Sequence, residues 1–179
     1  MRAGRLHTHG AKAAGEGINK SIMMEAVTFQ MTWPGAPTVY YGDEVSVVGW
    51  TDPDNRRTYP WGKEDLTMLN FHKAAIALRK RYAALRTGSV EFLYSRFGIL
   101  TYARWDEKNR LVIVLNNNNG QQHVSVPVWK AEVPKNSVMK RVLYTANDGF
   151  STEEERYVIK NGCLELDLMP FSSMVFVEV

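Results

Sequence analysis

The chain has 179 residues, and its 22 Lys and Arg against 19 Asp and Glu give a formal net charge of +3. Because these basic residues are scattered among acidic ones rather than gathered in runs, the composition argues against a nucleic-acid partner. With 45% apolar and 23% charged residues, and no apolar stretch of roughly 18 residues, the chain is predicted to be neither disordered nor membrane-spanning.

The length and the cysteine content set further bounds. Cys163 is the only cysteine, so an intramolecular disulfide and a four-thiolate zinc site are both excluded. The length suits one domain or two small ones, and it is shorter than the roughly 250 residues of a complete (β/α)₈ barrel. The redox compartment and the localisation stay open.

The first part of the chain predicts a loop, a helix and a short strand. Residues 1–20 have loop composition, and Ser21 is a candidate N-cap for a helix that ends near Trp33, before Pro34 and Gly35. The β-branched and aromatic residues 38–41 predict a buried strand. Both faces of this strand are apolar or aromatic, as in a parallel sheet covered by helices.

A long irregular segment and a second helix follow. Residues 43–64 contain two prolines, two glycines and three aromatic side chains, and loops of this length are usually functional. A helix is predicted over residues 65–86, with one buried stripe of apolar residues. The stripe consists of Met68, Phe71, Ala75, Leu78, Tyr82 and Leu85. The basic residues Arg79 and Arg86 are expected to lie off this stripe.

After Gly88 the apolar period changes from helical to two. Strands are predicted at residues 91–94, 99–105, 111–115, 123–129, 138–144, 157–159, 164–168 and 174–177. Seven or eight such strands predict an antiparallel sandwich over residues 89–179, a second domain after residues 1–88. The single strand of the first part needs partner strands that the chain does not contain, so that part has the character of a piece.

Two motifs indicate a family. Residues 30–44 read QMTWPGAPTVYYGDE, and residues 49–57 read GWTDPDNRR, followed by Pro60 and Trp61. This order of motifs, with a helix and a β-sandwich after them, resembles the C-terminal part of the α-amylase family of glycoside hydrolases (family thirteen), especially its α-amylase, neopullulanase and cyclomaltodextrinase branch. The resemblance implies a mixed fold. Residues 1–88 would be the end of a (β/α)₈ barrel (helix, strand eight, helix eight), and residues 89–179 its all-β domain C.

The same resemblance implies that the catalytic groups are absent. The family's nucleophile, acid/base and stabilising aspartate follow barrel strands four, five and seven, and none of them matches a position here. Residues 5–20 are similar to the stretch just downstream of the last motif. The expected function is that of a C-terminal fragment of a retaining hydrolase of α-glucans such as starch and maltooligosaccharides, catalytically incomplete in isolation. The alternative is a non-catalytic carbohydrate-binding or protein-binding β-sandwich module.

Neighbouring carboxylates do not replace the missing groups. Retaining glycosidases need two carboxyl groups about 5 to 5.5 Å apart. Asp43 and Glu44 are adjacent, so in a strand their side chains point to opposite faces, and we expect them instead to accept hydrogen bonds at the rim. No catalytic residue is predicted in this chain.

Asp52 and Arg56 are the predicted substrate-binding residues. By resemblance they hydrogen-bond a pair of glucose hydroxyls, and a carboxylate acceptor beside a guanidinium donor suits that task. The alternative is a surface ion pair that holds the loop, the role expected of Asp54 and Arg57. The loop aromatics Trp50, Tyr59 and Trp61 could stack on sugar rings, although packing onto the barrel is favoured.

No cofactor and no metal site is predicted. His7 and His9 lie two residues apart without a third ligand nearby, which makes a weak case for zinc. The expected partners are an α-glucan in the intact enzyme and, because of the unpaired strand and bare helix faces, either a second copy or an upstream barrel segment. The preferred glucan, its linkage and any calcium dependence stay open.

Overall fold

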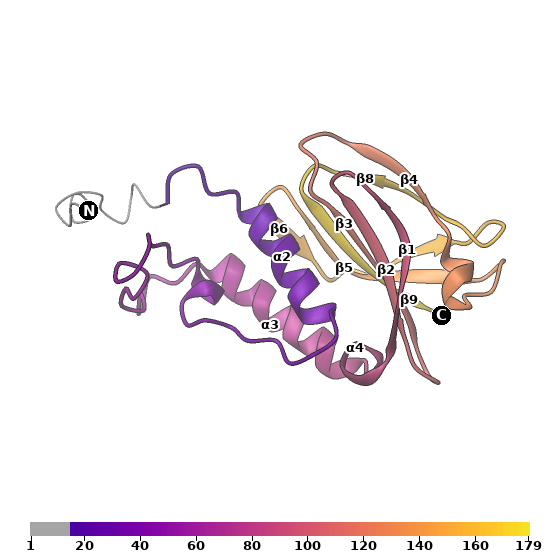
Figure 1. Cartoon of the computed structure of the whole chain (residues 1–179), viewed down its shortest axis with the longest axis horizontal. Coiled ribbons are helices and arrows are strands. Elements are labelled where there is room, and N and C mark those ends of the chain that lie inside the picture. The colour runs from indigo at the N-terminus through magenta and orange to yellow at the C-terminus, as the bar shows by residue number, and fades with distance from the viewer. Residues whose placement is uncertain (1–14) are drawn as a thin grey trace.

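The computed structural model describes residues 15–179, which form three stacked layers (Figure 1). The helical layer contains α2 (Lys20–Thr32), α3 (Leu66–Arg81) and the short α4 (Ala84–Thr87), with the 3-10 turn η2 (Asp43–Val45) between the two long helices. The middle layer is a seven-stranded antiparallel sheet in the order β1-β2-β3-β9-β5-β6, with β7 paired to β5. The third layer is the two-stranded sheet β4-β8. The strands are β1 (Ser89–Arg96), β2 (Ile99–Trp105), β3 (Arg110–Asn116), β4 (Gln122–Val126), β5 (Val138–Ala146), β6 (Gly149–Ser151), β7 (Glu155–Val158), β8 (Leu164–Leu168) and β9 (Ser172–Glu178), and the 3-10 turn η3 (Val128–Ala131) follows β4.

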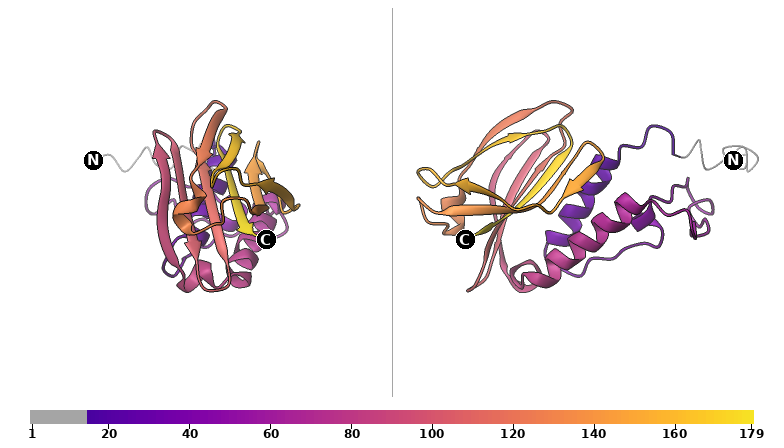
Figure 2. Two further views of the ribbon diagram at one scale, coloured as in Figure 1. Left: turned by 90° about the vertical axis from the view of Figure 1, so that its right-hand side faces the viewer. Right: turned by 180° about the vertical axis from the view of Figure 1, so that it is seen from behind.

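Strand β3 shows how both faces of the large sheet are buried. Leu111 and Ile113 belong to the core that the sheet forms with α2 and α3, whereas Val112 and Val114 belong to the core beneath β4 and β8. A strand buried on both faces needs no polar alternation, and residues 111–115 are accordingly all apolar. Figure 2 shows the helices on one side of this sheet and the small sheet on the other. The predicted β-sandwich is confirmed, with helices covering the outer face of its larger sheet.

The helices share one core with the sheet. Met24 of α2 and Phe71 of α3 are fully buried in the same cluster as Tyr102 of β2 and Val175 of β9. Burial of such side chains stabilises by roughly 1.5–3 kcal/mol each. Both the domain boundary at residue 88 and the assignment of the helices to the end of a barrel stay predictions.

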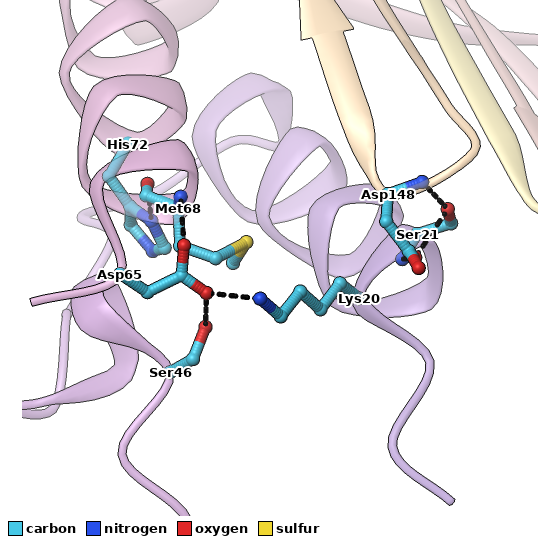
Figure 3. Close-up of polar contacts among 7 residues, drawn as sticks. All are labelled: Lys20, Ser21, Ser46, Asp65, Met68, His72 and Asp148. Carbon is cyan, nitrogen blue, oxygen red and sulfur yellow. Dashed lines mark hydrogen bonds and ion pairs between the residues drawn. The ribbon is translucent and has the colours of Figure 1, made fainter.

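The N-terminus of α2 is joined to the sheet by a polar contact. The N-cap is Asn19 rather than the predicted Ser21, and its side chain accepts hydrogen bonds from the amides of Ser21 and Ile22. The Asp148 carboxylate, in the turn between β5 and β6, accepts from the amide and hydroxyl of Ser21 at 3.0 and 3.1 Å (Figure 3). The amide of Asp148 in turn donates to the hydroxyl of Ser21. Two residues 127 positions apart thus fix this end of the helix.

The predicted strand at residues 38–41 is wrong for the described chain. Residues 36–40 have no regular structure, and Tyr40 and Tyr41 are each 47% exposed rather than buried. The backbone groups of a strand need a neighbouring strand, and no strand of residues 15–179 pairs with this segment. Its carbonyl at Thr38 accepts a hydrogen bond from the side chain of Gln30 instead.

The predicted helix at residues 65–86 is two helices. Tyr82 leaves the helical conformation, and α4 begins two residues later. The carbonyls near this break accept hydrogen bonds from arginine side chains: Arg86 donates to Arg79 O, and Arg79 donates to Leu85 O. Arg79 is therefore only 8% exposed, against the expectation that it lies off the buried stripe.

A second buried arginine joins the helices to the sheet. Arg104 of β2 is fully buried, and its guanidinium donates to the carbonyls of Thr32, Leu85, Gly88 and Ser89. Desolvation lowers the pKa values of both Arg79 and Arg104. Because helices end with unsatisfied carbonyls and a partial negative charge, these ends suit a cation.

Candidate functional site

The irregular segment at residues 43–64 lies at the N-terminal end of α3, away from the sheet (Figure 1). It starts with η2, which Gly42 precedes with a φ of 98° and Ser46 follows with a φ of 57°. The rest of the segment up to Asp65 forms turns without helix or strand. The sequence-predicted site residues all lie on this excursion.

Asp52 and Arg56 form the ion pair that their spacing suggested. Arg56 Nη2 lies 2.8 Å from carboxylate oxygens of Asp52, and the two side chains are 65% and 60% exposed. An exposed pair at this spacing stabilises a protein by only about 0.3–0.5 kcal/mol. The carboxylate and the guanidinium are thus both within reach of a ligand, and their contact with sugar stays a prediction.

The second pair of the motif lies deeper. Arg57 Nη2 and Nε donate to the Asp54 carboxylate at 2.7 and 3.3 Å, and the side chains are only 20% and 27% exposed. Asp54 also accepts from the amide of Trp50, and the Arg57 carbonyl accepts from the hydroxyl of Tyr41. These bonds join both ends of the loop, the arrangement expected of a loop-holding pair.

The aromatic side chains of the excursion remain accessible. Trp61 is 81% exposed and its ring centroid lies 4.5 Å from that of Tyr59, while Trp50 is 45% exposed. The expectation that they pack is not met by Trp61 within residues 15–179. An exposed indole face beside a hydrogen-bonding ion pair is a combination that suits a sugar ring.

Asp43 and Glu44 have structural contacts. The amide of Gly42 donates to Glu44 Oε2 at 2.8 Å, which confirms the expected backbone contact for that residue. Burial raises the pKa of Asp43, and the charge of His72 opposes this shift. Both residues lie in the 3-10 turn η2 rather than in the strand assumed for them.

Asp65 anchors the excursion to both long helices (Figure 3). Its carboxylate accepts from Lys20 Nζ at 2.5 Å, from Ser46 Oγ at 3.0 Å and from the amide of Met68 at 3.2 Å, so Asp65 is also the N-cap of α3. A cavity of about 570 Å³ adjoins this anchor, lined among others by Lys20, Ser46, Gly49 and Asp65. The sequence signal available was a capping-type residue before a helix, which says nothing about Lys20, 45 positions away.

This anchor predicts an acid-sensitive contribution to stability. Burial would raise the pKa of Asp65, but the hydrogen bonds from Lys20, the Met68 amide and Ser46 outweigh it, so the pKa lies below its ordinary value of 3.8. A depressed folded-state pKa contributes stability above that ordinary value and loses it as the pH falls through the folded-state pKa.

We therefore expect Asp65→Asn to lower the free energy of unfolding by about 0.5–1 kcal/mol near neutral pH, and by less as the pH falls below 3.8. Urea unfolding of both proteins across this pH range measures the difference. Lys20→Met removes one of the same bonds and should flatten the pH dependence in the same direction. A constant difference between Asp65→Asn and the wild type at every pH would contradict this account.

Two further features bear on the class of site. Among residues 15–179, no three or more His, Cys, Asp or Glu side chains are grouped so that they could hold a metal ion. His7 and His9 lie outside the described residues. No helix in this part of the chain has the length and apolar character that crossing a membrane requires.

Comparison with known proteins places this geometry among sugar-active enzymes. No protein-family model matches the chain. It is 32% identical over 152 residues to an amylopullulanase of Thermoanaerobacter thermohydrosulfuricus, a match that covers 78% of this chain and 10% of that protein. It is also 32% identical over 163 residues to neopullulanase 2 of Thermoactinomyces vulgaris, covering 89% of this chain and 26% of that protein.

The solved structures agree. An α-amylase from Geobacillus thermoleovorans, complexed with acarbose, matches with a TM-score of 0.77 and 26% identity over 93% of this chain and 35% of that one. The chain thus spans between a tenth and about a third of the length of these proteins.

Proposed function

This chain matches part of an α-amylase family protein, and from that relationship we propose that it forms the C-terminal portion of a retaining glycoside hydrolase that acts on α-glucans. The observation that carries the proposal is the 32% identity to an amylopullulanase over 78% of the chain. In this proposal the helices and the excursion complete a (β/α)₈ barrel, and residues 89–179 form domain C. The nucleophile, the acid/base and the stabilising carboxylate come from residues outside this chain.

In the proposed enzyme Asp52 and Arg56 bind the glucan. Sugar hydroxyls donate to the carboxylate of Asp52 and accept from the guanidinium of Arg56, so one pair of residues orients one pair of hydroxyls. The exposure of both side chains supports this role, as does their small contribution to stability. Asp54 and Arg57 hold the loop that presents them.

Kinetics of the intact enzyme that contains this segment test the binding role. We expect Asp52→Ala and Arg56→Ala each to lower kcat/KM for a maltooligosaccharide roughly 10-fold to 100-fold, the loss of one or two charged hydrogen bonds. Arg156→Ala is the matched control, because Arg156 is exposed on β7, in the part proposed as domain C. Unchanged kcat/KM in both loop variants would overturn the assignment.

The isolated chain tests the proposed incompleteness. We expect the purified chain to show no hydrolysis of maltooligosaccharides, and reproducible hydrolysis would overturn this part of the proposal. Titration with the same sugars separates the other candidate function. Saturable binding that persists in Asp52→Ala and Arg56→Ala would indicate a binding module on the β-sandwich instead.

We further infer that the exposed apolar surface of the helical part is covered in the intact enzyme. Nine large apolar side chains between residues 18 and 66 are exposed: Ile18, Ile22, Met23, Val39, Tyr40, Tyr41, Trp50, Trp61 and Leu66. Exposed apolar surface of this kind favours association. The proposed cover is an upstream barrel segment or, without one, a second copy of the chain. A monomer at high concentration in sedimentation equilibrium would contradict self-association.

A further inference from the structure

The chain contains two Asn-Gly pairs, Asn119–Gly120 and Asn161–Gly162. In such a pair the backbone nitrogen of the glycine can attack the side-chain carbonyl carbon of the asparagine, because glycine has no Cβ to hinder the approach. The new C–N bond closes a succinimide ring, and the side-chain nitrogen leaves as ammonia. Water then opens the ring to aspartate or isoaspartate. We propose that Asn119 is a site of this spontaneous deamidation and that the fold protects Asn161.

The run of four asparagines after β3 contains three that are engaged. The side-chain amides of Asn116, Asn117 and Asn118 donate hydrogen bonds to Met169 O, Glu25 Oε2 and Phe97 O, respectively. Asn119 follows them, is exposed, and has no hydrogen-bond partner for its side chain within residues 15–179. Its amide is therefore free to rotate toward the next residue.

The backbone after Asn119 is equally unconstrained. The N–H of Gly120 makes no hydrogen bond within the described chain. Apart from its chain neighbours, no heavy atom lies within 4 Å of the position that a Cβ on Gly120 would take. An unbonded nitrogen next to a mobile side-chain amide is the arrangement that ring closure requires.

The second pair differs in each of these respects. Asn161 and Gly162 have φ values of 53° and 80°, the left-handed turn conformation. Lys160 and Cys163 exchange two backbone hydrogen bonds across this turn, and the N–H of Gly162 donates to Lys135 O at 3.1 Å. Gly162 is buried, with the side chain of Trp129 at 3.0 Å from the position of a Cβ. The attacking nitrogen is thus occupied, and its release requires the turn to open.

The modification adds one negative charge near a buried carboxyl. Asn117, two residues before the site, donates to Glu25 of α2 at 2.8 Å. Glu25 is only 8% exposed, so this hydrogen bond is one of the contacts that hold the loop against the helix. Isoaspartate also lengthens the backbone of the loop. The region around Asn117 is therefore where an effect on the fold is expected.

Peptide mapping by mass spectrometry tests the proposal on the full chain, incubated folded at mildly alkaline pH. Deamidation at Asn119 is expected to be roughly tenfold faster, or more, than at Asn161, whose hydrogen bonds must first break. Equal rates at the two sites, or faster reaction at Asn161, would overturn the proposal. In guanidinium chloride the two rates should converge, and a difference that persists there would mean that the fold is not the cause.

Gly120→Ala supplies the matched variant. The open surroundings of Gly120 mean that a methyl group should leave the circular dichroism spectrum and the unfolding midpoint unchanged. The same methyl hinders ring closure, so deamidation at Asn119 should fall while the rate at Asn161 stays the same. An unchanged rate at Asn119 in this folded variant would count against cyclisation through Gly120.

Discussion

Replacing Arg104 by methionine is expected to lower the free energy of unfolding by about 3–5 kcal/mol. The guanidinium is fully buried and donates hydrogen bonds to four carbonyls: Thr32 O at 2.6 Å, Gly88 O at 3.0 Å, Ser89 O at 3.1 Å and Leu85 O at 3.2 Å. Methionine fills a similar volume but donates nothing, so several buried acceptors lose their partners. The midpoint of urea unfolding measures the loss.

Two further variants separate burial from charge. Arg156→Met makes the same chemical change on an exposed side chain of β7, and it should change stability by no more than about 0.5 kcal/mol. Arg104→Lys keeps the positive charge without the planar fork and should be intermediate. If Arg104→Met were no more destabilising than Arg156→Met, the four hydrogen bonds would not be the link between helices and sheet.

Gly88→Ala is expected to cost about 2–3 kcal/mol. Gly88 lies between α4 and β1, and a Cβ there would sit 2.4 Å from Trp105 O, 2.5 Å from Ala84 O and 2.8 Å from Ala84 Cα. All three atoms belong to the backbone, so no side-chain rotation relieves the contact. Its φ of −71° is open to any residue, so the cost comes from packing rather than from backbone strain.

Gly120→Ala is the control for this substitution as well. It adds the same methyl group at a glycine with no close neighbour, and we expect a change within about 0.5 kcal/mol. Urea unfolding of both variants gives the comparison. Similar midpoints for Gly88→Ala and Gly120→Ala would show that the backbone at the junction of α4 and β1 can move apart, against the close packing described above.

The strands of residues 89–179 were the most predictable part of the fold. The bounds predicted for residues 99–105 and 164–168 coincide with β2 and β8. Alternating apolar residues and turn sequences are local signals, so a short window contains the information. Strand β6 was missed, since three half-buried residues carry almost no pattern.

The candidate site was predictable only in its local part. Asp52 and Arg56 are four positions apart, and their pairing could be anticipated within one loop. The contact of Asp65 with Lys20 could not, because it joins the starts of two helices that meet only after the chain has folded. The same holds for Ser21 and Asp148.

The sequence by itself determined the composition class, the order of most helices and strands, and the motifs that resemble the α-amylase family. Only the tertiary structure decided that helices cover one face of the large sheet, that Arg79 and Arg104 are buried, and that residues 38–41 form no strand. The physical reason is the range of the interactions. Periodicity and turn chemistry act over a few residues, whereas hydrogen-bond satisfaction of a buried guanidinium or a strand edge depends on which distant backbone groups lie beside it.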